Sequence, residues 1–382
     1  MLTVLSSAML MAGCGGGGGD STATPAGAAG SSATGAITGF GSIIVGGVRF
    51  DDSAASVLDD DGASLTSGDL KLGMVVRIKG GKKTDDGSSV RAKAERIEVH
   101  SELQGPVDSK AADSIVVLGQ TVKISATTFF EDGLSLATLA VGAVVEVHGF
   151  VDTVNNTLTA TRIEGRPNAR AFKLQGAIKA LNIATKTFTI GTGSGSVTIS
   201  YLTAELPASL VLANDLVVRV RLARTPLTGT RTALKIQKFE IEKEDRNEAE
   251  VEGIITAFTS TAVFSVNGLP VNASAIVVPA GVRLGARVEV EGSIVNGVLV
   301  AKKVELEDGA DAAKFELHGT LSSLDTAAKT FVLRGVTVNY GTATFANGAT
   351  ATSLSIVGIK LEVKGMRSAG NVIVATRISI ER

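Results

Sequence analysis

An eight-residue segment that recurs five times is the feature that most constrains this chain. Its clearest copy is residues 285–292 (GARVEVEG), in which apolar and charged residues alternate between two glycines. Three further copies are residues 73–80 (GMVVRIKG), 142–149 (GAVVEVHG) and 358–365 (GIKLEVKG), and a degenerate copy is residues 215–222 (DLVVRVRL). The copies end at positions 80, 149, 222, 292 and 365, about 70 residues apart. A fixed period of this size predicts a tandem series of small domains.

Each period contains the pattern of five short strands. An apolar opening strand leads into a tight hairpin, such as the one at Gly46-Gly47, and a less regular stretch such as residues 127–141 precedes the repeated charged strand. A turn and a closing strand follow. Because side chains of a strand alternate between its two faces, Ala286, Val288 and Val290 should face the core and the charged residues between them should face outward.

Five short strands in an open sheet would leave two exposed edges. We therefore predict an all-β fold in which each period closes into a small five-stranded antiparallel β-barrel of the OB-like kind. Small β-sandwiches are the alternative. A unit of about 70 residues buries only a modest core, so each copy is expected to lean on its neighbours. The predicted organisation is a signal peptide at 1–13, a flexible Gly/Ser/Ala tether at 14–34, and repeats 1 to 5 at 35–100, 101–165, 171–242, 249–307 and 314–382.

The N-terminal segment carries the only cysteine of the chain, Cys14. Residues 2–12 are mostly apolar or small, and Met11-Ala12-Gly13 directly precede Cys14. This pattern resembles a bacterial lipoprotein signal peptide, which implies cleavage before Cys14 and lipidation of its thiol. The segment departs from the usual pattern because no Lys or Arg precedes the apolar stretch. The alternative is a buried or free thiol near the N-terminus.

This resemblance predicts that a lipid anchors the protein to the membrane. A spanning helix is not expected, because no apolar run beyond the N-terminal segment reaches the ~18 residues that such a helix needs. We expect an exported protein that is lipid-anchored at the outer membrane, on its periplasmic side or at the cell surface.

The first repeat also resembles a known family. Residues 39–51 (GFGSIIVGGVRFD), continued by residues 72–80 (LGMVVRIKG), are similar to a proteobacterial repeat family known as domain of unknown function 5666. The resemblance implies small all-β repeats and export. It implies no activity, and it brings no catalytic or binding residues.

Residues able to carry catalysis or hold a metal are scarce. The chain has three histidines, and comparison of the repeats puts His148 in the position held by Lys79 and Glu291 in other copies. We therefore predict exposed, structural roles for His100, His148 and His318. Asp59-Asp60-Asp61 lacks the spacing of a calcium loop and is predicted to form a polar turn. No nucleophile or phosphate-loop motif is present, so we predict no catalytic residues, no metal, no cofactor and no enzymatic activity.

Nucleic acid is not an expected partner. The formal net charge is −1, so the chain lacks the excess of positive charge that attracts the phosphate backbone of nucleic acid. Single-strand binding also needs aromatic rings on an outward sheet face. Phe188, Phe264 and Phe331 instead lie in alternating apolar strands and are predicted to be core residues.

A basic residue precedes the apolar core of each closing strand. These residues are Arg96, Arg162, Lys238, Lys303 and Arg377. One interpretation is a cross-strand ion pair with an outward carboxylate such as Glu146, Glu289 or Glu362. The other is a basic stripe along the repeats that binds an anionic polymer.

The function predicted from these features is a lipid-anchored, multi-repeat binding module of the cell envelope, because tandem weak sites gain avidity. Its expected ligand is an anionic polysaccharide or an envelope protein. The alternatives are a structural spacer and a periplasmic accessory factor without a small-molecule ligand.

Overall fold

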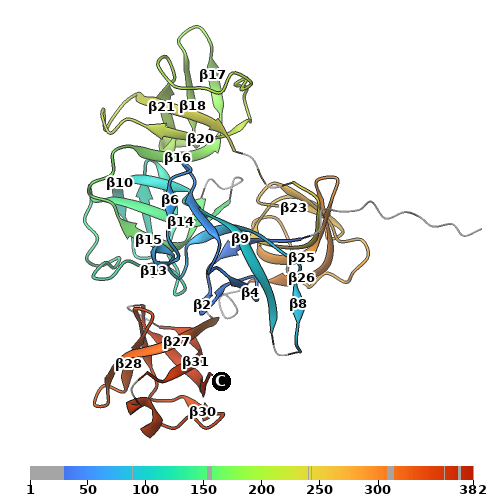
Figure 1. Ribbon diagram of the computed structural model, residues 1–382. Helices are drawn as coiled ribbons and strands as arrows, with labels where there is room; N and C mark the ends of the chain where they lie inside the picture. Colours follow the sequence, from blue (N-terminus) through green and yellow to red (C-terminus); the bar gives the residue numbers. More distant parts are fainter. Residues whose placement is uncertain are drawn as a thin grey trace, which may run out of the picture.

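The computed structural model describes residues 30–87, 89–152, 157–239, 241, 243–307, 314–356, 358–368 and 371–381. Strands dominate this part of the chain (Figure 1). The helical segments named in the described residues are short 3-10 turns: η1 (Ser67–Asp69), η2 (Gly193–Gly195) and η3 (Thr352–Ser355). Among the described residues, no helix has the length and apolar character needed to cross a bilayer. The predicted signal peptide and Cys14 lie outside the described residues.

The strands group by repeat. Repeat 1 contains β1 (Ser31–Ala36), β2 (Gly39–Phe40), β3 (Ile43–Val45), β4 (Val48–Asp51), β5 (Ser56–Asp59), β6 (Ser64–Leu65), β7 (Val75–Gly80), β8 (Thr84–Asp85) and β9 (Val90–His100). Repeat 2 contains β10 (Leu103–Lys110), β11 (Ser114–Val117), β12 (Gln120–Lys123), β13 (Phe129–Phe130), β14 (Val144–Asp152) and β15 (Thr157–Gly165). Repeat 3 contains β16 (Phe172–Ala177), β17 (Lys179–Asn182), β18 (Thr187–Ile190), β19 (Val197–Ser200), β20 (Val217–Leu222) and β21 (Arg231–Lys238).

The last two repeats follow the same order. Repeat 4 contains β22 (Arg246–Ser260), β23 (Val263–Val266), β24 (Leu269–Asn272), β25 (Arg287–Val295) and β26 (Val298–Leu306). Repeat 5 contains β27 (Lys314–Asp325), β28 (Thr330–Leu333), β29 (Val336–Asn339), β30 (Thr344–Ala346), β31 (Lys360–Arg367) and β32 (Ile373–Ile380).

Each repeat closes into a small barrel, as predicted. In repeat 2 the ring of paired strands runs β10, β11, β12, β15, β14 and back to β10. Repeat 4 has the same ring with β22, β23, β24, β26 and β25. This arrangement is a five-stranded barrel of the OB type. In repeats 1 and 3 the first strand of the ring is broken in two, as β1 with β2 and as β16 with β17.

One detail of the prediction was wrong: the barrels are not entirely antiparallel. The strands that come third and fifth along the chain are neighbours in the ring and run parallel, as β12 and β15 do in repeat 2 and β24 and β26 do in repeat 4. The reason is geometric. Strand directions cannot alternate all the way around a closed ring with an odd number of strands, so one neighbouring pair must run the same way. The irregular stretch between the third and fourth strands makes the crossover that this pairing needs.

The two glycines of the repeated segment are needed for different structural reasons. The first is the third residue of the β-turn that leads into the strand, where φ is positive, for example +85° at Gly142 and +81° at Gly73. In repeat 3 Asp215 takes this position with φ +68°, which Asp tolerates better than most residues. The second glycine lies at a register shift between the charged and closing strands, as at Gly149. A Cβ there would collide with the carbonyl oxygen of Thr159 across the bulge.

This difference predicts unequal effects of substitution in repeat 2. Gly149→Ala forces a Cβ into the backbone of β15 and should lower the free energy of unfolding by about 1–3 kcal/mol. Gly142→Asp should cost less, because its Cβ would meet no atom within 4 Å and repeat 3 already uses Asp there. Urea denaturation followed by far-UV circular dichroism measures both. Equal costs for the two variants would contradict this explanation.

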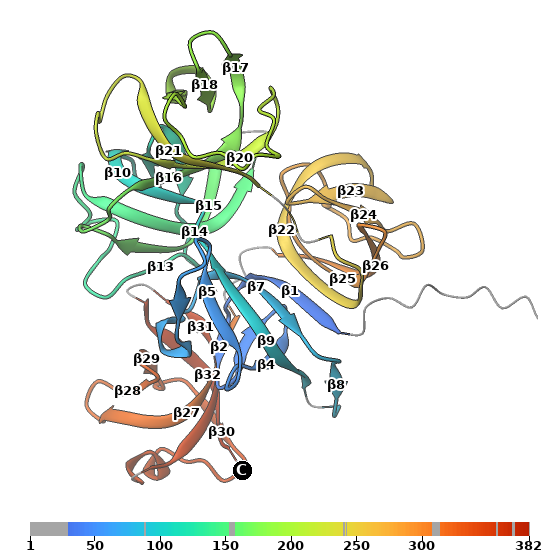
Figure 2. The ribbon, with the colours of Figure 1, turned by 45° about the horizontal axis from the view of Figure 1, so that its top comes forward.

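The other four barrels cluster around repeat 1 rather than forming a line (Figures 1 and 2). Strand β1 pairs in parallel with β22 of repeat 4, and β2 pairs in parallel with β27 of repeat 5. Repeats 2 and 3 are joined through antiparallel pairing of β10 and β16. Repeat 2 also contacts repeat 1 directly, because the Thr161 hydroxyl donates to the carbonyl oxygen of Gly73 at 2.6 Å. Repeat 1 therefore contacts repeats 2, 4 and 5 directly.

The predicted end of the tether was wrong by a few residues. Residues 31–34 are part of β1, where they pair with β7 and β22, and Ser31 and Ala33 are fully buried. The segment looks like a linker because its side chains are small. Small side chains are required there because two strands and the barrel core surround it.

The cores follow the predicted alternation and extend across repeat boundaries. Val288 and Val290 are fully buried, and Phe188, Phe264 and Phe331 are core residues as predicted. One continuous apolar core includes repeats 1 and 5, and a second includes repeats 2 and 3. Phe129 of repeat 2 packs edge-on against Phe315 of repeat 5, with ring centroids 4.9 Å apart. The expectation that small repeats lean on one another is confirmed for these pairs.

Candidate functional site

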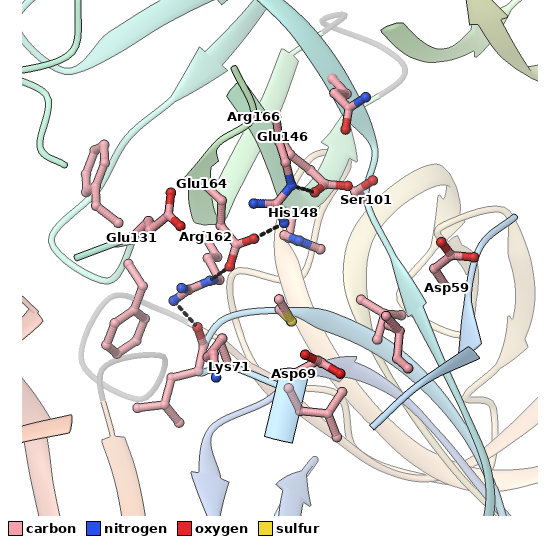
Figure 3. A pocket seen from close by; sticks show the side chains of 18 of the residues that line it. Asp59, Asp69, Lys71, Ser101, Glu131, Glu146, His148, Arg162, Glu164 and Arg166 are labelled. Atoms are coloured by element: carbon pink, nitrogen blue, oxygen red, sulfur yellow. Dashed lines mark hydrogen bonds and ion pairs between the residues drawn. The ribbon is translucent and has the colours of Figure 1, made fainter. Parts of the chain in front are cut away.

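A cleft of about 900 Å³ lies where repeats 1, 2, 3 and 5 meet. Figure 3 shows its charged interior, with Glu146, His148, Arg162, Glu164 and Arg166 drawn as sticks. Its walls come from the turn after β5, from β14 and β15, from the start of β16 and from the β28–β29 turn. We refer to it as the central cleft.

The charged residues of repeat 2 reach the cleft because of strand alternation. Val145 and Val147 point into the barrel core and are 1% and 0% exposed, so Glu146 and His148 on the same strand point outward. Glu146 lies directly opposite Glu164 on β15, and His148 lies opposite Arg162. Two adjacent strands thus place two carboxylates, an imidazole and a guanidinium on one face of the sheet.

These carboxylates are held in a buried ion-pair network. Arg166 donates to Glu146 at 2.7 Å and also to Glu164, which in addition binds Arg162. Burial opposes ionisation of Glu164, but the charges of Arg162 and Arg166 outweigh it and lower its pKa. Arg162 also donates to the carbonyl oxygen of Leu72 in repeat 1 at 3.2 Å. The network therefore fixes repeat 2 against repeat 1 as well as shaping the cleft.

His148 is oriented by a backbone carbonyl. Its Nδ1 lies 2.6 Å from the carbonyl oxygen of His100, and because a carbonyl can only accept, Nδ1 carries the proton. Burial lowers the pKa of His148, which favours the neutral ring. Its Nε2 is buried and has no hydrogen-bond partner among the residues described. A neutral imidazole therefore presents an acceptor on the cleft wall.

A second buried ion pair joins repeat 3 to repeat 1. The Lys173 ammonium lies 2.7 Å from one carboxylate oxygen of Asp60 and donates to the Ser101 hydroxyl at the same distance. Arg221 pairs with the next residue, Asp61, at 2.8 Å. Asp59 accepts from the backbone of Asp61 and shapes the turn. The three aspartates form a polar turn, as predicted, and two of them also bind the neighbouring repeat.

Among the described residues, two groups of side chains have the donor spacing of a metal site. Glu146, His148 and Glu164 form one group, and Glu316, His318 and Glu362 form the other; within each, the ligand atoms lie within 4.8 Å of one another. In the first group both carboxylates already bind guanidinium groups. In the second, Arg49 and Lys364 lie within 4 Å of both carboxylates. A divalent cation would compete with these fixed positive charges, so we interpret both groups as ion-pair networks.

Comparison with known families matches this repeat organisation. A family model described as "Domain of unknown function (DUF5666)" matches residues 34–98, 104–164, 252–305 and 318–379, which is more than half of the chain. The chain belongs to this family. No curated protein is significantly similar to it. The matched segments correspond to repeats 1, 2, 4 and 5, and repeat 3 closes into the same ring although its repeated segment is degenerate.

The prediction that the histidines are exposed was wrong for this DUF5666 chain. His148 and His318 are 2% and 5% exposed, and the His100 side chain is 12% exposed. The strand positions do face outward, as predicted. They are nevertheless buried because another repeat packs on that face: repeat 1 covers His148, and Gly41 of repeat 1 lies against His318.

The predicted basic stripe is only partly on the surface. Arg96, Lys238, Lys303 and Arg377 are exposed, but Arg162 is 8% exposed and belongs to the central cleft. The ion-pair interpretation also needs a change of partner. Arg96, Arg162 and Lys303 pair with Glu98, Glu164 and Glu305, each two residues further along the same strand, rather than with a carboxylate across the sheet.

Two residues of the cleft were missed because they lie at a predicted repeat boundary. Residues 165–170 contain a proline and two arginines, which indicated a linker between repeats 2 and 3. Arg166 instead binds Glu146 and Glu164, and Arg170 lies exposed at the cleft rim. The available signal was the coincidence of His148 and Glu164, which occur together in no other copy of the repeat.

Proposed function

We propose that this DUF5666 chain is an exported, lipid-anchored binding protein of the cell envelope whose ligand occupies the central cleft. The observation that carries the proposal is the cleft itself: about 900 Å³, formed by four repeats, with the unpartnered Nε2 of His148 on its wall. A polar cleft of this size, made by elements far apart in sequence, has the volume of a typical ligand site. A chain that served only as a spacer would gain nothing from such a cleft.

The ligand class follows from the groups around the cleft. Lys71, Arg170 and Arg334 are exposed at its rim. In the part of the chain that the structure describes, no carboxylate lies within ion-pair distance of Arg170 or Arg334, so both are available to an anion. The interior offers acceptors on Glu146, Glu164 and His148, which suit ligand hydroxyl groups. An oligosaccharide that carries carboxylate groups satisfies both sets.

A titration with two oligosaccharides tests the ligand class. We expect tetragalacturonate to bind and uncharged maltotetraose to bind more weakly in isothermal titration calorimetry. The double variant Arg170→Ala/Arg334→Ala should lose about tenfold in affinity, since two exposed ion pairs of up to about 1 kcal/mol each are removed. The matched control is Arg96→Ala/Arg377→Ala, which removes two exposed arginines that do not line the cleft.

The outcomes separate the candidate functions. A loss of affinity only in the control variant would favour a basic stripe over the cleft. Failure of both oligosaccharides to bind would favour the structural spacer. Anchoring is tested separately by fractionation of cells that express Cys14→Ser, which should release the protein from the membrane fraction. Retention of Cys14→Ser in that fraction would refute the lipid anchor.

A further inference from the structure

A second cavity, of about 430 Å³, lies on the other side of the repeat 1–repeat 2 contact. Its wall is mostly apolar and is assembled from four repeats. Representative residues are Val75 of repeat 1, Phe150 of repeat 2, Leu216 and Phe239 of repeat 3, and Leu269 of repeat 4. A cavity of this size with apolar walls is of the kind that holds small molecules. It shares none of its lining residues with the central cleft.

Two titratable side chains on the wall, each partly exposed, have buried polar atoms without hydrogen-bond partners. The Glu102 carboxyl oxygen Oε2 and both ring nitrogens of His100 make no hydrogen bond among the residues described. The nearest ion-pair contact of the His100 ring is a Glu98 oxygen 3.7 Å from Nε2, which is beyond hydrogen-bond distance. Buried polar atoms are almost always paired, so groups left unpaired at a cavity wall indicate where a ligand or water would bind.

Burial favours the neutral forms of Glu102 and His100, and two neutral groups favour an uncharged ligand head. Burial raises the pKa of Glu102 and lowers the pKa of His100, so burial favours the neutral form of each. A neutral carboxyl group and a neutral imidazole each offer one donor and one acceptor. Together they can satisfy a hydroxyl or carbonyl group, while the apolar wall covers a hydrocarbon body.

We propose that this cavity is a second binding site, for an amphipathic molecule with an apolar chain and a neutral hydrogen-bonding head held by Glu102 and His100. The site is independent of the central cleft and of the acidic saccharide assigned to it. Because four repeats form the wall, an occupant also ties them together. Binding should therefore stabilise the contacts between repeats.

The test uses the full chain and the neutral fluorescent probe N-phenyl-1-naphthylamine. We expect saturable binding of the probe and its displacement by 1-decanol, with decanoate displacing it less well. Val217→Phe introduces a larger side chain at the cavity wall and should weaken probe binding at least about tenfold. Val211→Phe is the matched control, because Val211 belongs to the same repeat, is 81% exposed and does not line the cavity.

A second pair of variants tests the polar head. Glu102→Gln keeps a donor and an acceptor and should bind decanol like the parent, whereas Glu102→Leu should bind decanol about tenfold more weakly and keep its affinity for the probe. If Val217→Phe does not fold, Val151→Phe fills the same cavity from repeat 2. Undiminished probe binding by the filled variant, tighter displacement by decanoate than by decanol, or equal decanol affinity of Glu102→Leu and the parent would each overturn the proposal.

Discussion

Replacing Arg162 with leucine should lower the free energy of unfolding by about 3–5 kcal/mol, the range expected when one partner is removed from a buried ion pair. Glu164, whose side chain is 5% exposed, would keep only Arg166 as a charged partner. The contact from Arg162 to the Leu72 carbonyl, which links repeats 1 and 2, would also be lost. Urea denaturation followed by far-UV circular dichroism measures the change.

The repeats supply an internal control for this prediction. Arg96 occupies the equivalent position in repeat 1 and pairs with Glu98 in the same way, but its side chain is 49% exposed. Arg96→Leu should therefore change stability by less than about 0.5 kcal/mol, as is usual at exposed positions. Adding Glu164→Gln to Arg162→Leu should recover part of the loss, because Glu146 and Glu164 no longer share Arg166 as two buried carboxylates on one guanidinium. Equal effects of Arg96→Leu and Arg162→Leu would show that burial does not determine the cost.

Glu289→Gln should remove much of the pH dependence of stability. Glu289 on β25 lies opposite Glu252 on one side and Glu305 on the other, beneath the Gly46 turn of repeat 1. No cation lies within ion-pair distance of it among the described residues. Burial, together with the negative charge of Glu252, Glu250 and other nearby glutamates, raises the pKa of Glu289 to about 8.

The sign of this effect follows from proton binding. Between pH 4.5, where an unfolded glutamate titrates, and about pH 8, the folded chain holds a proton on Glu289 that the unfolded chain has released. The stabilising contribution is complete below pH 4.5 and is lost as the pH rises through 8, by at most about 1.4 kcal/mol per pH unit. Glu289→Gln should therefore match the parent near pH 4.5 and exceed it by up to about 5 kcal/mol at pH 8.5.

Urea denaturation from pH 4.5 to 8.5 checks this expectation. A smaller slope should remain in the variant, because burial also raises the pKa of Glu250 to about 7. Glu95→Gln, which removes an exposed carboxylate from repeat 1, is the control and should leave the profile unchanged. Parallel profiles for Glu289→Gln and the parent would mean that Glu289 is ionised in the folded protein.

The barrel of each repeat could be predicted because its causes are local. Alternation in segments such as residues 285–292 placed Val288 and Val290 in the core, and the hairpin and turn signals gave the strand order. The parallel pairing of the third and fifth strands of each repeat also follows from closing five strands into a ring. Gly149 has a local cause as well, but the collision with Thr159 that requires glycine becomes visible only when the bulge is known.

The central cleft could not be predicted because it depends on contacts between repeats. His148, Arg162 and Glu164 occupy outward strand positions, and the sequence of one repeat does not say whether water or another barrel covers them. Their burial follows from the clustering around repeat 1, which rests on short contacts such as Thr161 with Gly73 and Gly41 against His318. Small residues at such contacts leave no periodic signal. Because of the same clustering, the basic residues of the closing strands do not form one linear stripe: Arg162 is buried in the central cleft, and the others are exposed.

Small-angle X-ray scattering from residues 30–382 tests the clustering most directly. Four barrels packed around repeat 1 should give a radius of gyration of about 20–25 Å, close to the value for a compact chain of this length. A linear series of five independent barrels of about 70 residues each would give roughly 40 Å. A value near 20–25 Å is the predicted result, and a value near 40 Å would contradict both the central cleft and the cavity beside it.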